Sequence, residues 1–390
     1  MRYKIAFYLP FIEQKHILHS HSHFAFAGWI TQVLMLLLVH HLSMKQGEQI
    51  LKKYRWLLYA NLITAYGMLI SFMIQGYAFF SISFSTLSIF VSYVFAVYYW
   101  KDLNRMNKKL VSNKWFKASL VFSVISSLGA FGLAFMMANK MMQQHWYLGL
   151  IYFFLHFQYN GWFFFAGMGL LVSRLEIIDV VAKKLKIAFQ LFCFACVPAY
   201  FLSALWMPFP RIIYYFIIAA VIAQLIGWLL MLKVFFQTRA FISHDFSKYG
   251  KILLLLSAIA FTIKLLLQSG SIHPSLSQLS YSFRPIIIGY LHLVLLAVTS
   301  IFIIGYIISF NLIAISRLLL TGIFIFVAGI IINELLLMLQ GVTALTYNSI
   351  PNINELLMVA AVILFTGIFI MFIGCLKNNT LNSLAEHEAA

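Results

Sequence analysis

Three histidines crowd the start of the first long apolar stretch of this sequence. His19, His21 and His23 directly precede an apolar segment that contains Trp29. Imidazole is costly in hydrocarbon unless it is paired or ligated, so the cluster predicts a functional site. His19 and His23 are four residues apart and share a helical face, whereas His21 points elsewhere. Such rings can supply an axial haem nitrogen; the alternative is an interfacial cluster that hydrogen-bonds lipid headgroups and water.

A second histidine lies deep inside a later apolar run. His156 is followed one helical turn later by Asn160 on the same helical face. A buried histidine with a polar companion can be a metal ligand held by its outer-shell partner, with copper or non-haem iron as the metal. The same pair can equally form a hydrogen-bonded clamp between two helices.

A third histidine, His292, is surrounded by apolar residues between Gly289 and Leu295. An unpaired imidazole is expensive in such surroundings, so some group must satisfy it. A hydrogen bond to a neighbouring Ser or Tyr is one answer. Because His292 is expected at a membrane depth similar to that of the first cluster, an axial haem ligand is the other.

Other reactive side chains give weaker patterns. Cys193 and Cys196 form a C-x-x-C within an apolar run, which predicts either packing by two small side chains or a copper site. With Cys375 also in an apolar run, the cysteines predict no disulfide framework. Lys264 and Glu334 are expected within membrane spans as an ion pair, a proton relay or snorkelling residues.

The composition fixes the class of protein that must position these residues. Of the 390 residues, 63% are hydrophobic and 9% are charged, and the mean hydropathy is +0.93. A soluble globule with this composition would lack polar cover, so we predict an all-α polytopic protein whose partner is the lipid bilayer. The net charge of +17 reflects Lys and Arg in short loops, and we predict no nucleic-acid binding.

The apolar runs predict about eleven transmembrane helices in one domain. Residues 1–20 form an amphipathic lead-in, 21–377 a single transmembrane domain, and 378–390 a polar tail. The expected spans are 22–43, 56–80, 82–100, 115–138, 146–173, 187–207, 210–235, 250–268, 284–309, 312–338 and 355–376.

The basic residues predict the orientation of these spans. They are concentrated in alternate loops, which the positive-inside rule places in the cytoplasm. This places the N-terminus on the outer side and the C-terminus on the cytoplasmic side of a cell inner membrane. At about 1.5 Å per residue, the first cluster, His156, His292, Lys264 and Glu334 then fall at similar depths in the outer half. The four basic loops contain Lys45, Lys52, Lys53 and Arg55; Lys101, Arg105, Lys108, Lys109, Lys114 and Lys117; Arg174, Lys183, Lys184 and Lys186; and Arg239, Lys248 and Lys251.

Three segments resemble motifs of the haem-copper oxidase superfamily, in particular of the nitric oxide reductase and cbb3-type catalytic subunits. Residues 21–29 are similar to the H-x-H-x-x-x-x-G segments of that group, and residues 156–162 resemble the H-x-W-V-E-G motif of its sixth helix. Residues 289–295 resemble the tenth-helix segment whose histidines ligate the haems. The resemblance implies a subunit I-like bundle that lacks the family's first helix.

The sequence also departs from the family pattern. The sixth span has no adjacent histidine pair, Tyr290 replaces a haem-ligating histidine, and Asn160 stands where the reductases carry Glu. The resemblance therefore implies a low-spin, b-type haem between the first span and His292, with an incomplete dinuclear site for oxygen or nitric oxide reduction.

Three functions remain open at this stage. The first is an electron-transfer or gas-reducing respiratory component, with a cytochrome c-type or quinol electron donor and partner membrane subunits. The second is a non-catalytic relative that senses or handles haem or copper. The third is a proton-coupled small-molecule transporter. Walker, nucleophile-elbow, H-E-x-x-H and Rossmann motifs are missing from the sequence.

Overall fold

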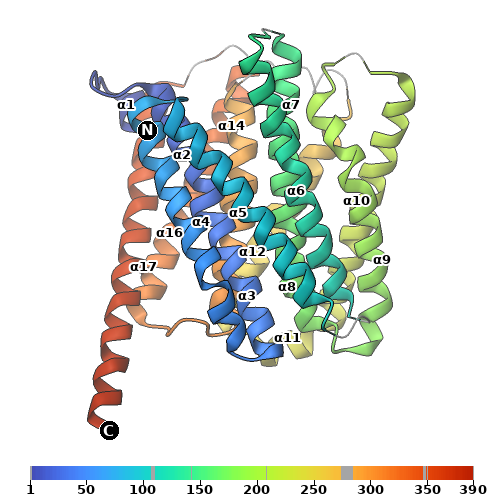
Figure 1. Ribbon diagram of the computed structural model, residues 1–390, viewed down its shortest axis with the longest axis vertical. Helices are drawn as coiled ribbons and strands as arrows, with labels where there is room; N and C mark the ends of the chain where they lie inside the picture. The colour runs from blue at the N-terminus through green and yellow to red at the C-terminus, as the bar shows by residue number, and fades with distance from the viewer. Residues whose placement is uncertain are drawn as a thin grey trace. The chain divides into compact units, whose positions relative to one another are not determined.

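The protein is helical throughout the part of the chain that its computed structural model describes, as predicted (Figure 1). The described residues are 2–106, 110–141, 143–207, 209–273, 284–345, 348 and 350–389. Lys108 and Lys109 of the second basic loop lie outside them. The chain divides into two compact units, Pro10–Thr238 with Gln268–Ser277, and Arg2–Leu9 with Arg239–Leu267 and Gln278–Ala390.

The first unit is a bundle of long helices in which neighbours in sequence pack side by side. Helix α2 packs on α4, α4 on α5, α6 on α7 and α8, and α9 on α10. Its elements are α2 (Gln14–His23), η1 (Phe24–Thr31), α3 (Gln32–Gln46), α4 (Gln49–Gln75), α5 (Phe79–Leu103), α6 (Val111–Ala138), α7 (Gln144–His156), η2 (Phe157–Phe163), α8 (Phe164–Leu175), α9 (Asp179–Cys196), η3 (Pro198–Ala204) and α10 (Arg211–Gln237).

The second unit has its own buried apolar cluster, to which α12, η4, α15 and α16 contribute. The short α1 packs against α17. The elements are α1 (Arg2–Ala6), α11 (Arg239–Asp245), α12 (Lys248–Gly270), α14 (Arg284–His292), η4 (Leu293–Ser300), α15 (Ile301–Ser309), α16 (Arg317–Leu345) and α17 (Ile353–Ala389). The last residues of α12, from Gln268, belong to the first unit.

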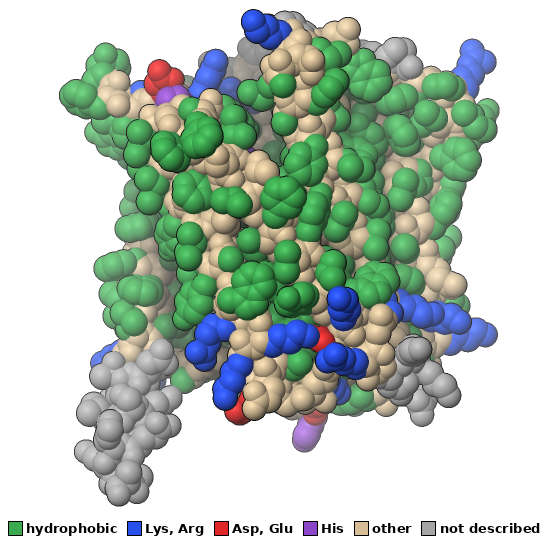
Figure 2. All heavy atoms as spheres, viewed as in Figure 1, with side chains coloured by type: hydrophobic (Ala, Val, Ile, Leu, Met, Phe, Trp, Pro, Cys, Tyr) green, Lys and Arg blue, Asp and Glu red, His purple; other side chains and the backbone are tan. Residues whose placement is uncertain are grey.

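The helices identify a multi-pass membrane protein. Within the described residues, nine helices are long and apolar enough to cross a bilayer, or ten if the bent pair Val180–Cys196 and Pro198–Ala204 is one span. Figure 2 shows hydrophobic side chains spread over the outer surface of α4, α5 and α6, with Lys and Arg gathered below them. This is the surface expected of helices that face lipid, with cations at the headgroups.

Several boundaries differ from the sequence prediction, and two of them concern the histidine cluster and the C-terminal tail. The first long helix begins at Gln14 rather than near residue 22, so the whole histidine cluster lies inside α2. The last helix continues through the predicted polar tail to Ala389. In both places the helix continues beyond the apolar span into polar residues. Hydropathy does not detect this continuation.

Helices α16 and α17 pack with their backbones in contact. A Cβ atom added at Gly367 would lie 2.5 Å from the backbone nitrogen of Phe326, and one added at Gly322 would lie 2.6 Å from that of Met371. Gly329 and Gly374 make similar approaches one heptad further along their helices. Small residues at such spacing let membrane helices approach closely, which supplies the dispersion contacts that hold them together.

Candidate functional site

Each of the three histidine segments identified from the sequence leads directly into a π-helical segment. The π segments η1, η2 and η4 begin at Phe24, Phe157 and Leu293, which follow His23, His156 and His292. A π segment inserts an extra residue into a helical turn, so it rotates the side chains on either side of it relative to each other. Such segments are rare and frequently occur at functional sites.

The first cluster packs against the end of α4. The Ser20 hydroxyl, between two of the histidines, donates a hydrogen bond of 2.6 Å to the carbonyl of Leu69. The His23 ring stacks on Phe72 with 4.2 Å between ring centroids. Its Nε2 lies 3.2 Å from the Tyr77 hydroxyl. His23 is thus held by an aromatic face and a phenol, whereas the His21 side chain is exposed.

The turn after α4 completes the surroundings of this cluster. The His19 ring meets Tyr77 edge-on at 4.6 Å. Gly76 adopts a φ of +62°, and a Cβ atom there would lie 2.5 Å from Nε2 of His16, so only glycine fits. Burial raises the pKa of Tyr77 to about 12. Tyr77 therefore remains a neutral phenol at neutral pH and can donate its proton to His23.

His156 joins α7 to the broken end of α9. Its Nε2 lies 2.8 Å from the backbone carbonyl of Cys196, and its Nδ1 accepts from the Asn160 amide at 3.1 Å. Since a carbonyl can only accept, Nε2 carries the proton and the ring is neutral. The side chain is 1% exposed. This arrangement, which we call the His156 latch, is the interhelical clamp that the sequence left open beside the metal-ligand alternative.

Pro198 explains why a carbonyl is available there. Proline has no N–H and cannot continue an α-helix, so α9 ends at Cys196 and the chain continues as η3 after a bend of 43°. A helix end leaves backbone carbonyls without their usual partners. The latch satisfies one of them with an imidazole.

The two cysteines of the C-x-x-C have different surroundings. The Cys196 thiol is buried and lies 3.7 Å from the Asn160 carbonyl, beside the latch. Cys193 instead lines an apolar pocket of about 430 Å³ with Phe194, Val197 and other residues of α9, η3 and α10. The copper site predicted for the pair remains a prediction.

His292, in the second unit, is hydrogen-bonded within its own helix. Its Nδ1 lies 2.8 Å from the carbonyl of Ile288, one turn earlier. Since a carbonyl can only accept, the Nδ1 of His292 carries a proton. A histidine whose Nδ1–H is held by a backbone carbonyl commonly ligates a metal through Nε2.

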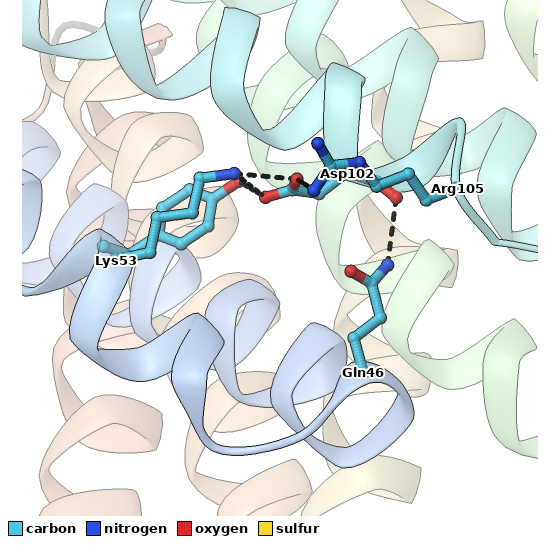
Figure 3. Close-up of polar contacts among 5 residues, drawn as sticks. Gln46, Lys53, Asp102 and Arg105 are labelled. Carbon is cyan, nitrogen blue, oxygen red and sulfur yellow. Dashed lines mark hydrogen bonds and ion pairs between the residues drawn. The ribbon is translucent and has the colours of Figure 1, made fainter.

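A buried carboxylate in the first unit escaped the sequence analysis. Asp102, near the end of α5, is fully buried. It receives Lys53 Nζ at 2.7 and 2.6 Å, the Tyr54 hydroxyl at 2.8 Å and Arg105 Nη1 at 3.4 Å (Figure 3). Gln46, from the end of α3, donates to the Asp102 carbonyl at 2.9 Å. We call this set the Asp102 hub; it ties together the ends of three helices.

A signal for the hub was present in the sequence. Asp102 is the only acidic residue between Glu48 and Glu176, and it lies in the second basic loop. Basic loops indicate the orientation of a membrane protein, and a lone acid among their cations is also a natural ion-pair centre.

The described residues contain no group of three or more His, Cys, Asp or Glu side chains that could hold a metal ion. A haem with two axial histidines needs no such group. No protein-family model matches the chain, and no curated protein matches its sequence.

Proposed function

We propose that this chain is a haem-binding integral membrane protein with His292 as an axial ligand. His19, His21 and His23 of the first unit are further candidate haem ligands, as the sequence predicts. The observation that carries the proposal is the hydrogen bond between Nδ1 of His292 and the Ile288 carbonyl, directly before a π segment, because a histidine held in this way commonly ligates a metal through Nε2. A helix retains such an irregularity where the position of a side chain matters more than regular hydrogen bonding.

The chemistry of the donor set fits haem iron. His292 is in the tautomer that offers Nε2 to a metal. In the first unit, the Nε2 of His23 lies 3.2 Å from the Tyr77 hydroxyl, a group that can rotate away. A b-type haem held by two imidazoles supplies one-electron chemistry. We therefore propose electron transfer, with a cytochrome c-type or quinol donor.

The His156 latch favours a second candidate over oxygen or nitric oxide reduction. A reducing site needs a metal beside the haem, and His156 is a candidate ligand for such a metal in the sequence prediction. Both ring nitrogens of His156 are instead engaged by the protein. A non-catalytic protein that senses or handles haem is thus the second candidate.

We also propose the number of membrane spans and their orientation. Counting the bent pair and Gln144–Leu175, the chain has eleven spans of a subunit I-like bundle in a cell inner membrane, with the N-terminus outside. A reporter fused after Lys377 should report the cytoplasm, and one inserted near Gln143 should report the exterior. The reverse result at either place contradicts this orientation.

The decisive experiment is the visible absorption spectrum of detergent-purified protein, oxidised and reduced. Protein from haem-replete cells should show the sharp reduced bands of a bis-histidine haem. A colourless preparation contradicts the proposal and favours the proton-coupled transporter. If haem is present, turnover of oxygen or nitric oxide with a chemical reductant distinguishes a reductase from a non-catalytic haem protein.

A further inference from the structure

A single carboxyl group lies deep within the apolar run of α16. Between Leu318 and Met338, Glu334 is the only side chain that can ionise. The candidate membrane span ends at Thr343, which lies about 14 Å beyond Glu334 along the helix. Ionisable side chains at such depth are expensive and rare, and they mark functional positions by default.

Glu334 lies on the face of α16 that packs into the second unit. Ile330, one turn before it, and Leu337, one turn after it, share this face, and each is 1% exposed. Ile330 belongs to the apolar cluster that contains Leu293, and Leu337 belongs to a second cluster with Leu357. The side chain of Glu334 is itself partly exposed. It therefore lies on a packed face without being sealed off.

The carboxyl group of Glu334 has one neutral partner. The Asn333 amide donates to its Oε1 at 3.1 Å, and Asn333 is 3% exposed. Among the residues that the structure describes, Asn333 is the only hydrogen-bond partner of Glu334, and no cation forms an ion pair with it. The titratable side chains on the surrounding helices are Lys264 of α12, Arg284, Tyr290 and His292 of α14, and Glu355 of α17.

This environment favours the protonated acid over the carboxylate. An amide hydrogen bond satisfies one carboxyl oxygen in either form. It does not offset the loss of hydration of a full negative charge, and a buried carboxylate without a cation partner becomes neutral by taking up a proton.

We infer that Glu334 is a proton-binding site within the membrane. The ligand is the proton itself, which requires no cavity. Because the side chain is partly exposed, the proton can be exchanged. Reversible loading of a proton at this depth is the chemistry that a membrane protein uses to couple proton movement to its own reaction. The inference goes beyond the proposed function and does not depend on haem.

The experiment uses dicyclohexylcarbodiimide, an apolar reagent that enters membranes and reacts with protonated carboxyl groups. The carboxyl proton moves to a nitrogen of the reagent and the carboxyl oxygen bonds to its central carbon, so nothing leaves. The adduct then rearranges to a stable acylurea. The purified full chain, Glu334→Gln and Glu48→Gln are treated over a range of pH, and peptide masses locate the label. Glu48 is the control because its side chain is exposed.

At neutral pH the label should be found on Glu334 in the wild type and in Glu48→Gln, and it should be lost in Glu334→Gln. Glu48 should remain unlabelled, because an exposed Glu has a pKa of about 4.3 and is ionised at neutral pH. Labelling of Glu334 should fall as the pH rises, since the protonated fraction falls. An unlabelled Glu334 at neutral pH overturns the inference, as does labelling that is constant up to alkaline pH.

Infrared spectroscopy gives a second measurement. The C=O stretching band of a protonated carboxyl group should be present at neutral pH, shift in heavy water, disappear at alkaline pH and return on acidification. An ionised Glu334 would give neither the band nor the label. If Glu334→Gln does not fold, both measurements on the wild type still decide, because peptide masses identify the labelled residue. A colourless preparation refutes the proposed haem function and leaves this test unaffected.

Discussion

His156 and His292 occupy equivalent local positions and differ in what their rings do. Each ends an α-helix and directly precedes a π segment. The His156 ring donates to the Cys196 carbonyl across to another helix and accepts from Asn160. The His292 ring is instead fixed by the Ile288 carbonyl of its own helix.

The difference shows that the π segment identifies a constrained histidine without revealing its role. The role follows from the partner of Nε2, since a metal ligand must present that nitrogen or its counterpart deprotonated. In His156 the Nε2 proton is held by a carbonyl, which makes the ring a structural connector. In His292 the proton is on Nδ1, so under the proposed function Nε2 is the nitrogen that would ligate the iron.

Replacing His292 with Ala should abolish the low-spin haem spectrum entirely. An axial ligand supplied by one residue has no substitute in its own helix. The spectrum should be recorded at matched protein yield, with His156→Ala as the control that keeps it. An unchanged spectrum in His292→Ala would contradict the assignment of His292 as an axial haem ligand.

Replacing Asp102 with Ala should lower the free energy of unfolding by roughly 3 kcal/mol. This is the lower end of the range for a broken buried ion pair, because Lys53 is 36% exposed and can be rehydrated. The Asp102 hub therefore gives a reference for the loss of stability when a purely structural polar cluster is broken. The loss at the His156 latch can be compared with it. Denaturant unfolding in detergent measures the loss, and a haem-loaded Asp102→Ala sample should keep its spectrum; a changed spectrum would contradict a purely structural role.

Replacing His156 with Ala should cost roughly 2 kcal/mol, since it leaves the Cys196 carbonyl and the Asn160 amide without their partner. The haem spectrum should persist. If His156→Ala is as stable as the wild type, the latch does not stabilise the fold. If the variant loses the haem spectrum, His156 is a cofactor ligand after all.

The smallest effects should come from single changes in the first cluster. His21→Ala should leave haem content nearly unchanged, because this side chain is exposed. His23→Ala should remove part of the haem, because a neighbouring histidine can replace it. The haem-to-protein ratios of the two variants measure the effect. A complete loss of haem in His21→Ala would contradict the expectation that His23 contributes more to haem binding than His21.

Much of the architecture could be predicted from hydropathy and charge. The helical, multi-pass character is confirmed because the bilayer imposes long apolar helices on any such composition. The common depth predicted for Lys264, His292 and Glu334 depends only on counting residues along each span.

The side-chain partners could not be predicted in the same way. The acceptor of the His156 latch is a backbone carbonyl, which exists at every residue and becomes available only where Pro198 ends a helix. The π segments depend on how turns are packed, and no residue type specifies them. The Asp102 hub depends on the approach of three helix ends, although its lone acid was visible.

The glycine contacts between α16 and α17 have a mechanical consequence. Where backbones touch, no side chain between them can change rotamer to absorb a displacement. We therefore expect α16 and α17 to move together over the stretch where these glycines lie, so that a displacement of one helix there also displaces the other.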